Sequence, residues 1–354
     1  MSKVLLGDVA RERRETCKGS KDGYPIVGLE HLTPEEITLS TWDEGKDSTF
    51  TKLFRKGDVL FGRRRAYLKK AAVAPFDGIC SGDITVIEAI PDKILPELLP
   101  FIIQNDALFD FAVGKSAGSL SPRVKWEHLR NYSFELPDLE EQRRLATVLW
   151  AMDATKKAYQ KLIRKTDELV KSQFIARFGD PKTNPKGFDT ISGKRLFSLS
   201  SGKFLPDAKR LPHGYPVYGG NGIAWHTDST LIDYPTIVIG RVGAYCGNVK
   251  LVKEPVWITD NAIYITKMLS DCIDLDFLYH LMSFLDLPRF ADYVGQPKIT
   301  QKPLEALDYI IPSKAAQSDF VSFVQQSDKS KFELEQALAE LTATYKRIIA
   351  ENLG

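Results

Sequence analysis

The stretch Val59–Tyr67 reads VLFGRRRAY, and the stretch Ile237–Tyr245 reads IVIGRVGAY. Both consist of an apolar run, Gly-Arg, two variable residues and Ala-Tyr, so that Gly62-Arg63 of the first corresponds to Gly240-Arg241 of the second. A second pair of similar segments is Tyr24–Gly28 and Tyr215–Gly219. Because a long-period repeat determines the architecture before any single motif does, these matches predict a chain built from two similar halves.

Each half ends in a segment of fixed length. Pro137–Asp153 and Pro312–Asp328 share a Pro-x4-Gln motif, an apolar residue three positions after the Gln and a closing Asp, with the same spacing throughout. The offset in numbering between the halves falls from 191 at Tyr24 to 178 at Gly62 and 175 at Pro137, so the insertions lie inside the globular parts. Each half is therefore predicted to be a variable globular module followed by a rigid element.

The rigid element is predicted to be a long helix. Negative charge after Pro137 suits a helix N-terminus, and Gly179 with Pro181 ends the first helix. From Glu141 to Arg177 this gives about 37 residues, or roughly 55 Å. Both helices carry a heptad-like seam interrupted by polar residues. The seam positions are Leu145, Leu149, Met152, Lys156, Tyr159, Ile163, Thr166 and Val170 in the first helix, and Phe320, Val324, Ser327, Lys331, Leu334, Leu338, Leu341, Tyr345 and Ile348 in the second.

A seam of this length cannot be buried against one small module, so each helix needs a partner helix. The repeated phase makes the other helix the obvious partner, and antiparallel packing would place the modules at opposite ends. The alternative is that both are long core helices of one domain. The predicted fold is α+β, with two pseudo-repeated globular domains separated by two long helices that pack as an antiparallel coiled coil. The predicted divisions are 1–137 for the first globular domain, 138–180 for the first helix, 181–312 for the second globular domain and 313–354 for the second helix.

Length and composition place the chain among ordinary globular proteins. Its 354 residues favour two domains, and 43% hydrophobic with 27% charged residues excludes disorder as the main state. Lys+Arg 48 against Asp+Glu 46 gives a net charge of +2, which excludes a polycation. Any nucleic-acid surface must therefore come from local clustering of charge.

The sequence predicts neither a membrane-spanning helix nor a signal peptide. Its apolar stretches fall far short of the roughly 20 residues of a membrane-spanning helix, and its first residues lack the apolar core of a signal peptide. The four cysteines form no C-x-x-C pair; they are Cys17, Cys80, Cys246 and Cys272. These features predict a cytoplasmic protein with reduced thiols and no membrane contact.

Two basic loops of the first module are candidates for DNA contact. Arg63–Lys70 holds five basic residues and a tyrosine within eight positions. Arginine binds guanine or phosphate in a bidentate manner, and a loop at a strand end can enter a groove. Lys115–Lys125 combines small residues with basic ends, as in loops that hold phosphates. The alternatives are a solvated turn and an ordinary linker. The predicted DNA-contacting residues are Arg63, Arg64, Arg65, Tyr67, Lys69, Lys70, Lys115, Ser116, Arg123 and Lys125.

The second module has counterparts of both loops. The repeated motif supplies a Gly-Arg pair and a tyrosine, and Gly295–Thr300 corresponds to the loop with basic ends. Gly219–His226 (GGNGIAWH) is a glycine-rich turn whose asparagine could pair with adenine. As a phosphate cradle it is weak, because it lacks the Lys-Ser/Thr ending of a P-loop and the full G-x-G-x-x-G. The predicted DNA-contacting residues are Asn221, His226, Arg241, Tyr245 and Lys298.

Signatures of catalysis are mostly missing from the sequence. There is no G-x-S-x-G elbow, no H-x-x-x-H pair and no Asn-Pro-Pro-Tyr/Phe tetrapeptide of adenine methyltransferases. Glu44-Gly45-Lys46 matches the short Asp/Glu-x-Lys core of many nucleases, but a three-residue match arises by chance in most chains of this length. The sequence therefore predicts neither a catalytic residue nor a metal site.

The duplicated module, the Pro-x4-Gln motif and the long heptad helix together resemble the specificity (S) subunit of type I restriction-modification systems. Leu136–Arg144 (LPDLEEQRR) is similar to the central conserved region of that family, and Phe178–Pro181 with Asn184–Gly187 links the first helix to the second module. The resemblance covers essentially the whole chain. It departs from the family pattern at Ser313–Gln317 (SKAAQ), which lacks the usual Pro-Leu-x-Glu-Gln.

The resemblance implies a non-catalytic DNA-recognition subunit. In that family two target-recognition domains each read one half of an interrupted double-stranded DNA sequence, while the helices set the gap and dock methyltransferase (M) subunits, expected to number two. Restriction-translocase (R) subunits can join, and S-adenosylmethionine, ATP and Mg are expected in these partners, with no cofactor bound by this chain. The docking and helix-seam roles fall on Gln142, Leu145, Leu149, Met152, Tyr159, Ile163, Gln317, Phe320, Val324, Leu334, Leu338 and Leu341.

Physical arguments agree with this interpretation. Helices of about 55 Å would separate two readers by more than one turn of B-DNA, roughly 34 to 36 Å. The near-neutral net charge predicts modest DNA affinity for the chain alone. Two alternatives stay open: a self-contained nuclease or methyltransferase, and a helical scaffold whose modules do not touch DNA. Charge reversal at Arg63–Arg65 separates a reader from a scaffold.

Overall fold

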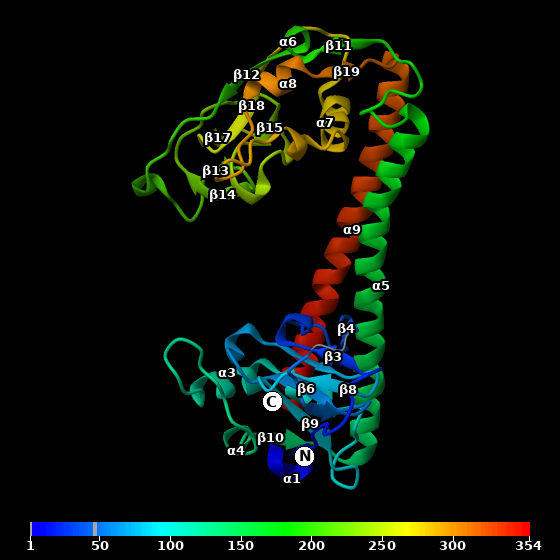
Figure 1. Cartoon of the computed structure of the whole chain (residues 1–354), viewed down its shortest axis with the longest axis vertical. Coiled ribbons are helices and arrows are strands. Elements are labelled where there is room, and N and C mark those ends of the chain that lie inside the picture. The colour runs from blue at the N-terminus through cyan, green and yellow to red at the C-terminus, as the bar shows by residue number, and fades with distance from the viewer. Residues whose placement is uncertain (1, 45–47) are drawn as a thin grey trace. The chain divides into compact units, whose positions relative to one another are not determined.

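The chain folds into two compact units that both draw on segments far apart in the sequence. The computed structural model describes residues 2–44 and 48–354. Unit 1 consists of Met1–Leu162 and Leu334–Gly354, and unit 2 of Ile163–Glu333. Each unit therefore contains one globular module and about half of each of two long helices (Figure 1).

The first module contains three sheets and short helices. The strand orders are β2-β9-β6-β7, β4-β3-β8-β5 and β1-β10. Its elements are β1 (Ser2–Leu5), α1 (Leu6–Val9), β2 (Ala10–Glu12), β3 (Pro25–Val27), η1 (Leu29–His31), β4 (Asp43–Glu44), β5 (Lys52–Phe54), β6 (Val59–Gly62), η2 (Ala66–Leu68), β7 (Ala71–Val73), β8 (Gly78–Cys80), β9 (Ile84–Ala89), α2 (Leu99–Ile103), α3 (Asp106–Gly114), α4 (Trp126–Leu129) and β10 (Ser133–Leu136).

The second module repeats this arrangement, except that among the described residues its sheet β14-β13-β17 has no strand corresponding to β5. The strand orders are β12-β18-β15-β16, β14-β13-β17 and β11-β19. Its elements are β11 (Thr190–Ser192), α6 (Gly193–Leu196), β12 (Phe197–Ser201), η3 (Asp207–Lys209), β13 (Tyr215–Gly219), β14 (Gly222–Thr227), β15 (Thr236–Gly240), η4 (Gly243–Tyr245), β16 (Val249–Val252), β17 (Trp257–Ile258), β18 (Ala262–Met268), α7 (Leu275–Phe284), η5 (Leu287–Phe290), α8 (Gln301–Ala306) and β19 (Asp308–Ile310).

The strand registers show that the repeat is structural. Leu60 pairs with Val86 on one side and Ala72 on the other. Val238, its counterpart in the second module, pairs with the counterparts of both partners, Tyr264 and Lys250. The parallel β3–β8 and β13–β17 pairs correspond as well. The apolar run of the repeated motif forms the central strands β6 and β15, which are buried along their whole length. The predicted internal repeat is confirmed.

The two long helices are α5 (Leu139–Phe178) and α9 (Lys314–Leu353), with 40 residues each. The first begins two residues before the predicted start, because the Asp138 side chain accepts hydrogen bonds from the first free backbone N–H groups of the helix. It ends where Gly179 adopts a φ of +78°, in the left-handed region that glycine tolerates. None of the described helices is long and apolar enough to cross a membrane.

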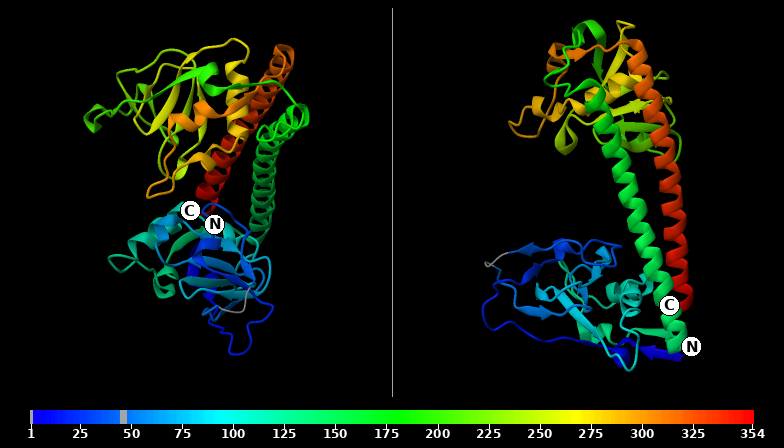
Figure 2. Two further views of the ribbon diagram at one scale, coloured as in Figure 1. Left: turned by 45° about the horizontal axis from the view of Figure 1, so that its top comes forward. Right: turned by 90° about the vertical axis from the view of Figure 1, so that its right-hand side faces the viewer.

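Within each unit the two helices pack in opposite directions (Figure 2, right). In unit 2, Phe174 of α5 packs against Phe320 of α9, while Asp167, earlier in α5, pairs with Lys331, later in α9. In unit 1, the ammonium group of Lys156 lies 4.7 Å from the centre of the Tyr345 ring. The seam positions are the least exposed face of both helices. The α+β class, with two repeated modules and two long antiparallel helices, is confirmed.

A buried glutamine fastens each long helix to its own module. Gln142 donates to the carbonyl of Pro137 at 2.9 Å and accepts from the backbone N–H of Leu95 at 2.8 Å. Gln317 donates likewise to Pro312 at 2.9 Å and accepts from Asp274 at 2.7 Å. The Pro-x4-Gln motif is thus a structural clamp that orients the start of the helix.

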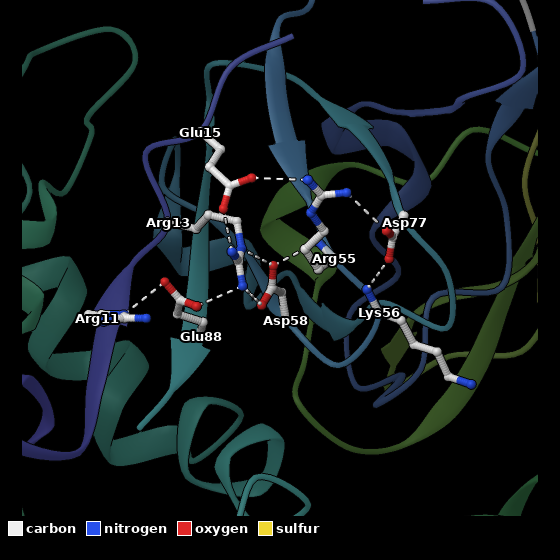
Figure 3. Close-up of polar contacts among 8 residues, drawn as sticks. All are labelled: Arg11, Arg13, Glu15, Arg55, Lys56, Asp58, Asp77 and Glu88. Atoms are coloured by element: carbon white, nitrogen blue, oxygen red, sulfur yellow. Dashed lines mark hydrogen bonds and ion pairs between the residues drawn. The ribbon is translucent and has the colours of Figure 1, made fainter. Parts of the chain in front are cut away.

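A network of charges lies in the β2–β9–β6 region of the first module (Figure 3). The guanidinium of Arg13 donates to Asp58 at 2.7 Å and 3.1 Å, to Glu88 at 2.7 Å and to Glu15 at 2.6 Å. Asp58 is 3% exposed, and the bonds to Asp58 above all raise the pKa of Arg13. In place of Asp58 the second module has Thr236, whose hydroxyl donates to the carbonyl of Ile265.

Candidate nucleic-acid interface

In the first module, backbone hydrogen bonds join the two basic loops that the sequence singled out. We call residues 62–70 the Gly-Arg loop and residues 114–125 the distal loop. Arg65 N–H donates to Pro122 at 2.8 Å, and Val124 N–H donates to Arg63 at 3.0 Å. Two loops that are far apart in the sequence thus form one surface.

The second module makes the same bonds at corresponding positions. Its Gly-Arg loop is residues 240–248 and its distal loop residues 290–300. Gly243 N–H donates to Pro297 at 2.9 Å, and Ile299 N–H donates to Arg241 at 2.9 Å. Both distal loops are closed by a bridge, between Ala117 and Arg123 in the first module and at the corresponding place in the second. The paired loops are therefore a duplicated feature.

One carboxylate organises the basic side chains of the first pair of loops. Asp83 lies 2.7 Å from Nε of Arg123 and 3.5 Å from Nη1 of Arg64. These guanidinium groups, Arg123 above all, lower the pKa of Asp83. Arg64 also donates to the hydroxyl of Ser121 at 3.0 Å. Two arginines from two loops are thus held by one acid, which leaves a local excess of positive charge.

The remaining candidates of the Gly-Arg loop differ in whether their side chains are exposed or already bonded within the module. Arg65 is exposed, and Tyr67 is 55% exposed. Arg63 is half-buried, with an Nε that has no hydrogen-bond partner in the described part of the chain. The two lysines bind within the module: Lys69 pairs with Asp106, and Lys70 donates to the carbonyl of Leu29 at 2.7 Å.

The candidates of the first distal loop lie at its two ends. Lys115 is exposed and its ammonium group lies 5.8 Å from the Phe111 ring centre. Ser116 donates to the carbonyl of Ala112 at 2.8 Å. Lys125 is exposed where α4 begins, two residues after Arg123. The loop thus presents cations beside a hydroxyl that is already bonded.

In the second module the structure brings four of the five candidates together. Arg241 donates to the carbonyl of Asp260 at 3.2 Å, Tyr245 is 49% exposed, and Lys298 is exposed in the distal loop. Asn221 lies at the exposed turn between β13 and β14. This turn is close to the Gly-Arg loop, because a Cβ added to the neighbouring Gly220 would lie 3.4 Å from the carbonyl oxygen of Val242.

His226 is placed apart from that group. It pairs with Pro216, at the far end of the hairpin from the Gly219–Gly222 turn. At about 3.3 Å per residue along a strand, this puts His226 more than roughly 10 Å from Asn221.

Sequence reasoning missed Asp83 and the tips of the distal loops. Leu120 is 90% exposed and Val294 is 91% exposed. Asp83 has a counterpart in Asn261, since their backbone carbonyls accept from Arg63 and Arg241 in the same way, so extending the repeat alignment to this position could have drawn attention to it. The tips had no signal in the sequence, since one apolar residue in a loop is unremarkable before its exposure is known.

The seam candidates lie where the helices contact each other and the modules. Leu145, Leu149, Phe320 and Val324 are buried in the cores of the units. Gln142 and Gln317 are 2% and 0% exposed. Their amides are used by the clamps, so they are not part of an exposed docking face. The other seam candidates are half-buried; they are Met152, Tyr159, Ile163, Leu334, Leu338 and Leu341.

The described residues include one group whose ligand atoms lie close enough together to hold a metal ion. Glu30, His31 and Asp43 bring such atoms within 4.8 Å of one another. Nδ1 of His31 accepts from the N–H of Gly28 at 2.9 Å, so only Nε2 is left. Of the nuclease-like Glu44-Gly45-Lys46 triplet, Gly45 and Lys46 lie outside the described residues. The prediction that the chain holds no metal stays a prediction.

Fold and site together define a duplicated α+β protein, with a pair of joined loops on each module and two long helices shared between the units. The family model for the type I restriction modification DNA specificity domain matches residues 3–165 and 185–342. The chain therefore belongs to the family of specificity subunits of type I restriction-modification systems.

Two curated proteins of Escherichia coli match in sequence. The chain is 27% identical to the type I restriction enzyme EcoprrI specificity subunit over 150 residues, which cover 40% of this chain and 37% of that protein. It is 25% identical to the EcoDI specificity subunit over 185 residues, which cover 46% of this chain and 40% of that protein. The matches thus span about two fifths of each curated relative.

Solved structures agree with the fold. The S subunit of a type I restriction-modification system from M. genitalium matches with a TM-score of 0.65 at 15% identity, covering 100% of this chain and 96% of that one. A chain from a structural study of complex assembly and conformational transition of the type I restriction-modification system matches with a TM-score of 0.59 at 21% identity, covering 99% and 97%. At these identities the similarity concerns the fold alone.

Proposed function

We propose that each module reads one half of an interrupted double-stranded DNA site through its paired loops. Residues 1–137 and 181–312 are the two readers in this proposal, and the helices of 138–180 and 313–354 set the gap between half-sites. The single observation that carries the proposal is the duplicated joining of a Gly-Arg loop to a distal loop by equivalent backbone bonds. Family membership makes DNA the expected partner.

The side chains of the paired loops suit two different roles: some can hold the DNA backbone, and others can contact the bases. Arg64 and Arg123 are held by Asp83 in fixed orientations, which suits contacts to the phosphate backbone. Exposed apolar tips such as Leu120 can contact the methyl group of thymine or the edges of bases. Since the chain carries a net charge of only +2, we expect tight binding only when partner subunits add positive charge.

The outer faces of the helices are the proposed docking surface for methyltransferase subunits. On α5 in unit 2, Leu169 is 45% exposed and Ile175 is 38% exposed, beside a shallow apolar depression that Ile175 lines with Ala176. On α9, Phe332 is 60% exposed. Large apolar side chains exposed on a helix suit a protein partner. Catalysis, with S-adenosylmethionine, ATP and Mg, is assigned to the partner subunits.

The test is co-expression with a methyltransferase (M) subunit of a type I restriction-modification system from the same host, followed by mapping of methylated adenines. One bipartite motif with an unread gap of constant length supports the proposal. Co-purification without any motif would leave docking in place and remove DNA reading. If the two proteins never associate, the docking proposal fails.

Charge reversal at Arg63–Arg65 distinguishes the reader from a helical scaffold. A reader loses modification of its motif, whereas a scaffold keeps both assembly and every activity of the complex. A matched reversal of three exposed basic residues outside the paired loops, Lys93, Lys194 and Arg195, should leave modification intact and so controls for bulk charge.

A further inference from the structure

Arg65 adopts a backbone conformation for which the second module uses glycine. Its φ is +55°, and the φ of its counterpart Gly243 is +78°. The same relation holds between Lys69, at +51°, and Gly247, at +85°. This left-handed region is unfavourable for residues other than Gly, Asn and Asp. The first module therefore places two basic side chains at strained positions.

Packing does not explain the arginine. At Gly247 a Cβ would lie 2.6 Å from the nitrogen of Pro288, so contact as well as φ restricts that position to glycine. At Gly243 the nearest atom would be Nε2 of Gln296 at 3.3 Å, so φ is the main reason for glycine there. Glycine at position 65 would suit the same backbone without strain.

The Arg65 side chain makes no compensating contact within the unit. It is exposed, and none of residues 2–44 and 48–354 forms a hydrogen bond, ion pair or ring contact with its guanidinium. Its neighbours differ, because Arg64 is bound to Asp83 and Lys69 is bound to Asp106. A strained residue whose side chain contributes no contact to its own fold points to a role of that side chain outside it.

We propose that Arg65 reads guanine in the half-site of the first module, through bidentate hydrogen bonds from its guanidinium to O6 and N7. This inference rests on the proposed function. A phosphate contact is the other use of a free arginine, but a cation at an unstrained neighbouring position would serve it equally well. A base contact, in contrast, requires the side chain to leave the backbone at one particular position. The second module, with Gly243, lacks this contact.

The test uses the complex with its methyltransferase partner on a random library of double-stranded DNA. The variants are Arg65→Gly, Arg65→Lys and the control Arg195→Gln, which removes one positive charge from an exposed position on α6. Arg65→Gly should fold normally, because glycine occupies the equivalent position of the second module. Hydrogen exchange of the Gly-Arg loop checks this directly.

We expect both Arg65 variants to lose discrimination at one G·C pair of one half-site by about tenfold or more, with the other half-site unchanged. Arg195→Gln should leave all positions unchanged. Uniform weakening in Arg65→Gly, rescued by Arg65→Lys, would show a phosphate contact and overturn base reading. An unchanged motif together with unchanged affinity in Arg65→Gly overturns any role of Arg65. If the wild-type complex yields no bipartite motif, the proposed function fails, and this inference fails with it.

Discussion

The Gly-Arg loops of the two modules share their backbone and differ in their side chains. Both are joined to a distal loop by equivalent hydrogen bonds, yet Arg65 of the first stands where the second has Gly243. Backbone hydrogen bonds do not depend on the side chain, so a duplicated loop retains its conformation while its exposed chemistry diverges. This difference indicates that the two modules present different surfaces on the same framework.

The interiors of the two modules likewise differ in side chains at corresponding positions. In the first module, Arg13, Asp58 and Glu88 form a charged network between strands. In place of the two acids, the second module has Thr236 and Thr266, whose hydroxyls donate to backbone carbonyls. Removing one member of a buried ion-pair network should therefore destabilise a module more than removing one neutral hydroxyl does.

The largest expected effect tests this interior difference. Arg13→Met leaves the buried Asp58 carboxylate without its guanidinium and should lower the free energy of unfolding of unit 1 by about 4 kcal/mol. Thr236→Val in the second module should lower that of unit 2 by about 1 kcal/mol. Native-state hydrogen exchange on the full chain measures both units at once. Equal losses would refute the contrast.

Acid should affect unit 2 through a half-buried histidine, His280. Burial lowers the pKa of His280 from 6.5 to about 4, with Asp276 opposing and Lys253 adding to the shift. As pH falls below 6.5 the unfolded state takes up the proton first, so stability is lost between pH 6.5 and 4, by up to about 3 kcal/mol.

The measurement is the difference in hydrogen exchange between wild type and His280→Leu across this pH range. The variant should remove this part of the pH dependence in peptides of unit 2 and leave those of unit 1 unchanged. A pH dependence that is the same in both proteins would show that the histidine does not carry it.

The two glutamine clamps should respond alike. Methionine has a similar volume but cannot form the hydrogen bonds, so Gln142→Met should lower the stability of unit 1 by about 2 kcal/mol. Gln317→Met should lower that of unit 2 somewhat more, because Gln317 also donates to the carbonyl of Cys272 at 2.9 Å. Urea denaturation monitored by exchange in α5 and α9 gives both values. A neutral result at either position would show that the motif is not a clamp there.

The seam lysines should give the smallest effects, with opposite signs. Lys156 is 8% exposed and lies over Tyr345 with no ion pair among the described residues, whereas Lys331 pairs with Asp167. Lys156→Met should raise stability by about 1 kcal/mol, and Lys331→Met should lower it by about 0.5 kcal/mol.

Raising the pH tests whether burial of the Lys156 charge causes the difference between the two lysines. Burial lowers the pKa of Lys156 below 10.5, so above the folded-state pKa the folded protein releases the proton before the unfolded chain does. The gain from Lys156→Met should therefore shrink as pH approaches 10.5. Thermal unfolding from about pH 7 to 10 measures this. A gain that stays constant with pH would mean that burial of the charge is not its cause.

The repeat and the helices could be predicted because their signals are local or periodic. A strand such as β6 is an apolar run that ends at a glycine, and the seam of α5 follows the 3.6-residue period of a helix. Because the chain is duplicated, each of these signals occurs twice in the sequence. The strand pairing agrees with the predicted repeat, because β3 pairs with β8 as β13 pairs with β17, and β6 pairs with β9 as β15 pairs with β18.

The state of each charged side chain could not be predicted in this way. Lys69 and Lys70 belong to the same basic run as the arginines before them, yet they bind Asp106 and the carbonyl of Leu29. Asp83 carries no motif, yet it holds two arginines. Such pairings depend on which loops the fold brings within a few ångströms of one another.

The sequence by itself therefore determined the duplicated plan, the two long helices and the phase of their seams, because these follow from backbone periodicity and repeated spacing. Only the tertiary structure decided that Gln142 is a clamp, that Asp83 joins two loops and that Arg65 is left free at a strained position. The physical reason is that hydrogen bonds and ion pairs between distant segments form only after chain folding sets the distances between them.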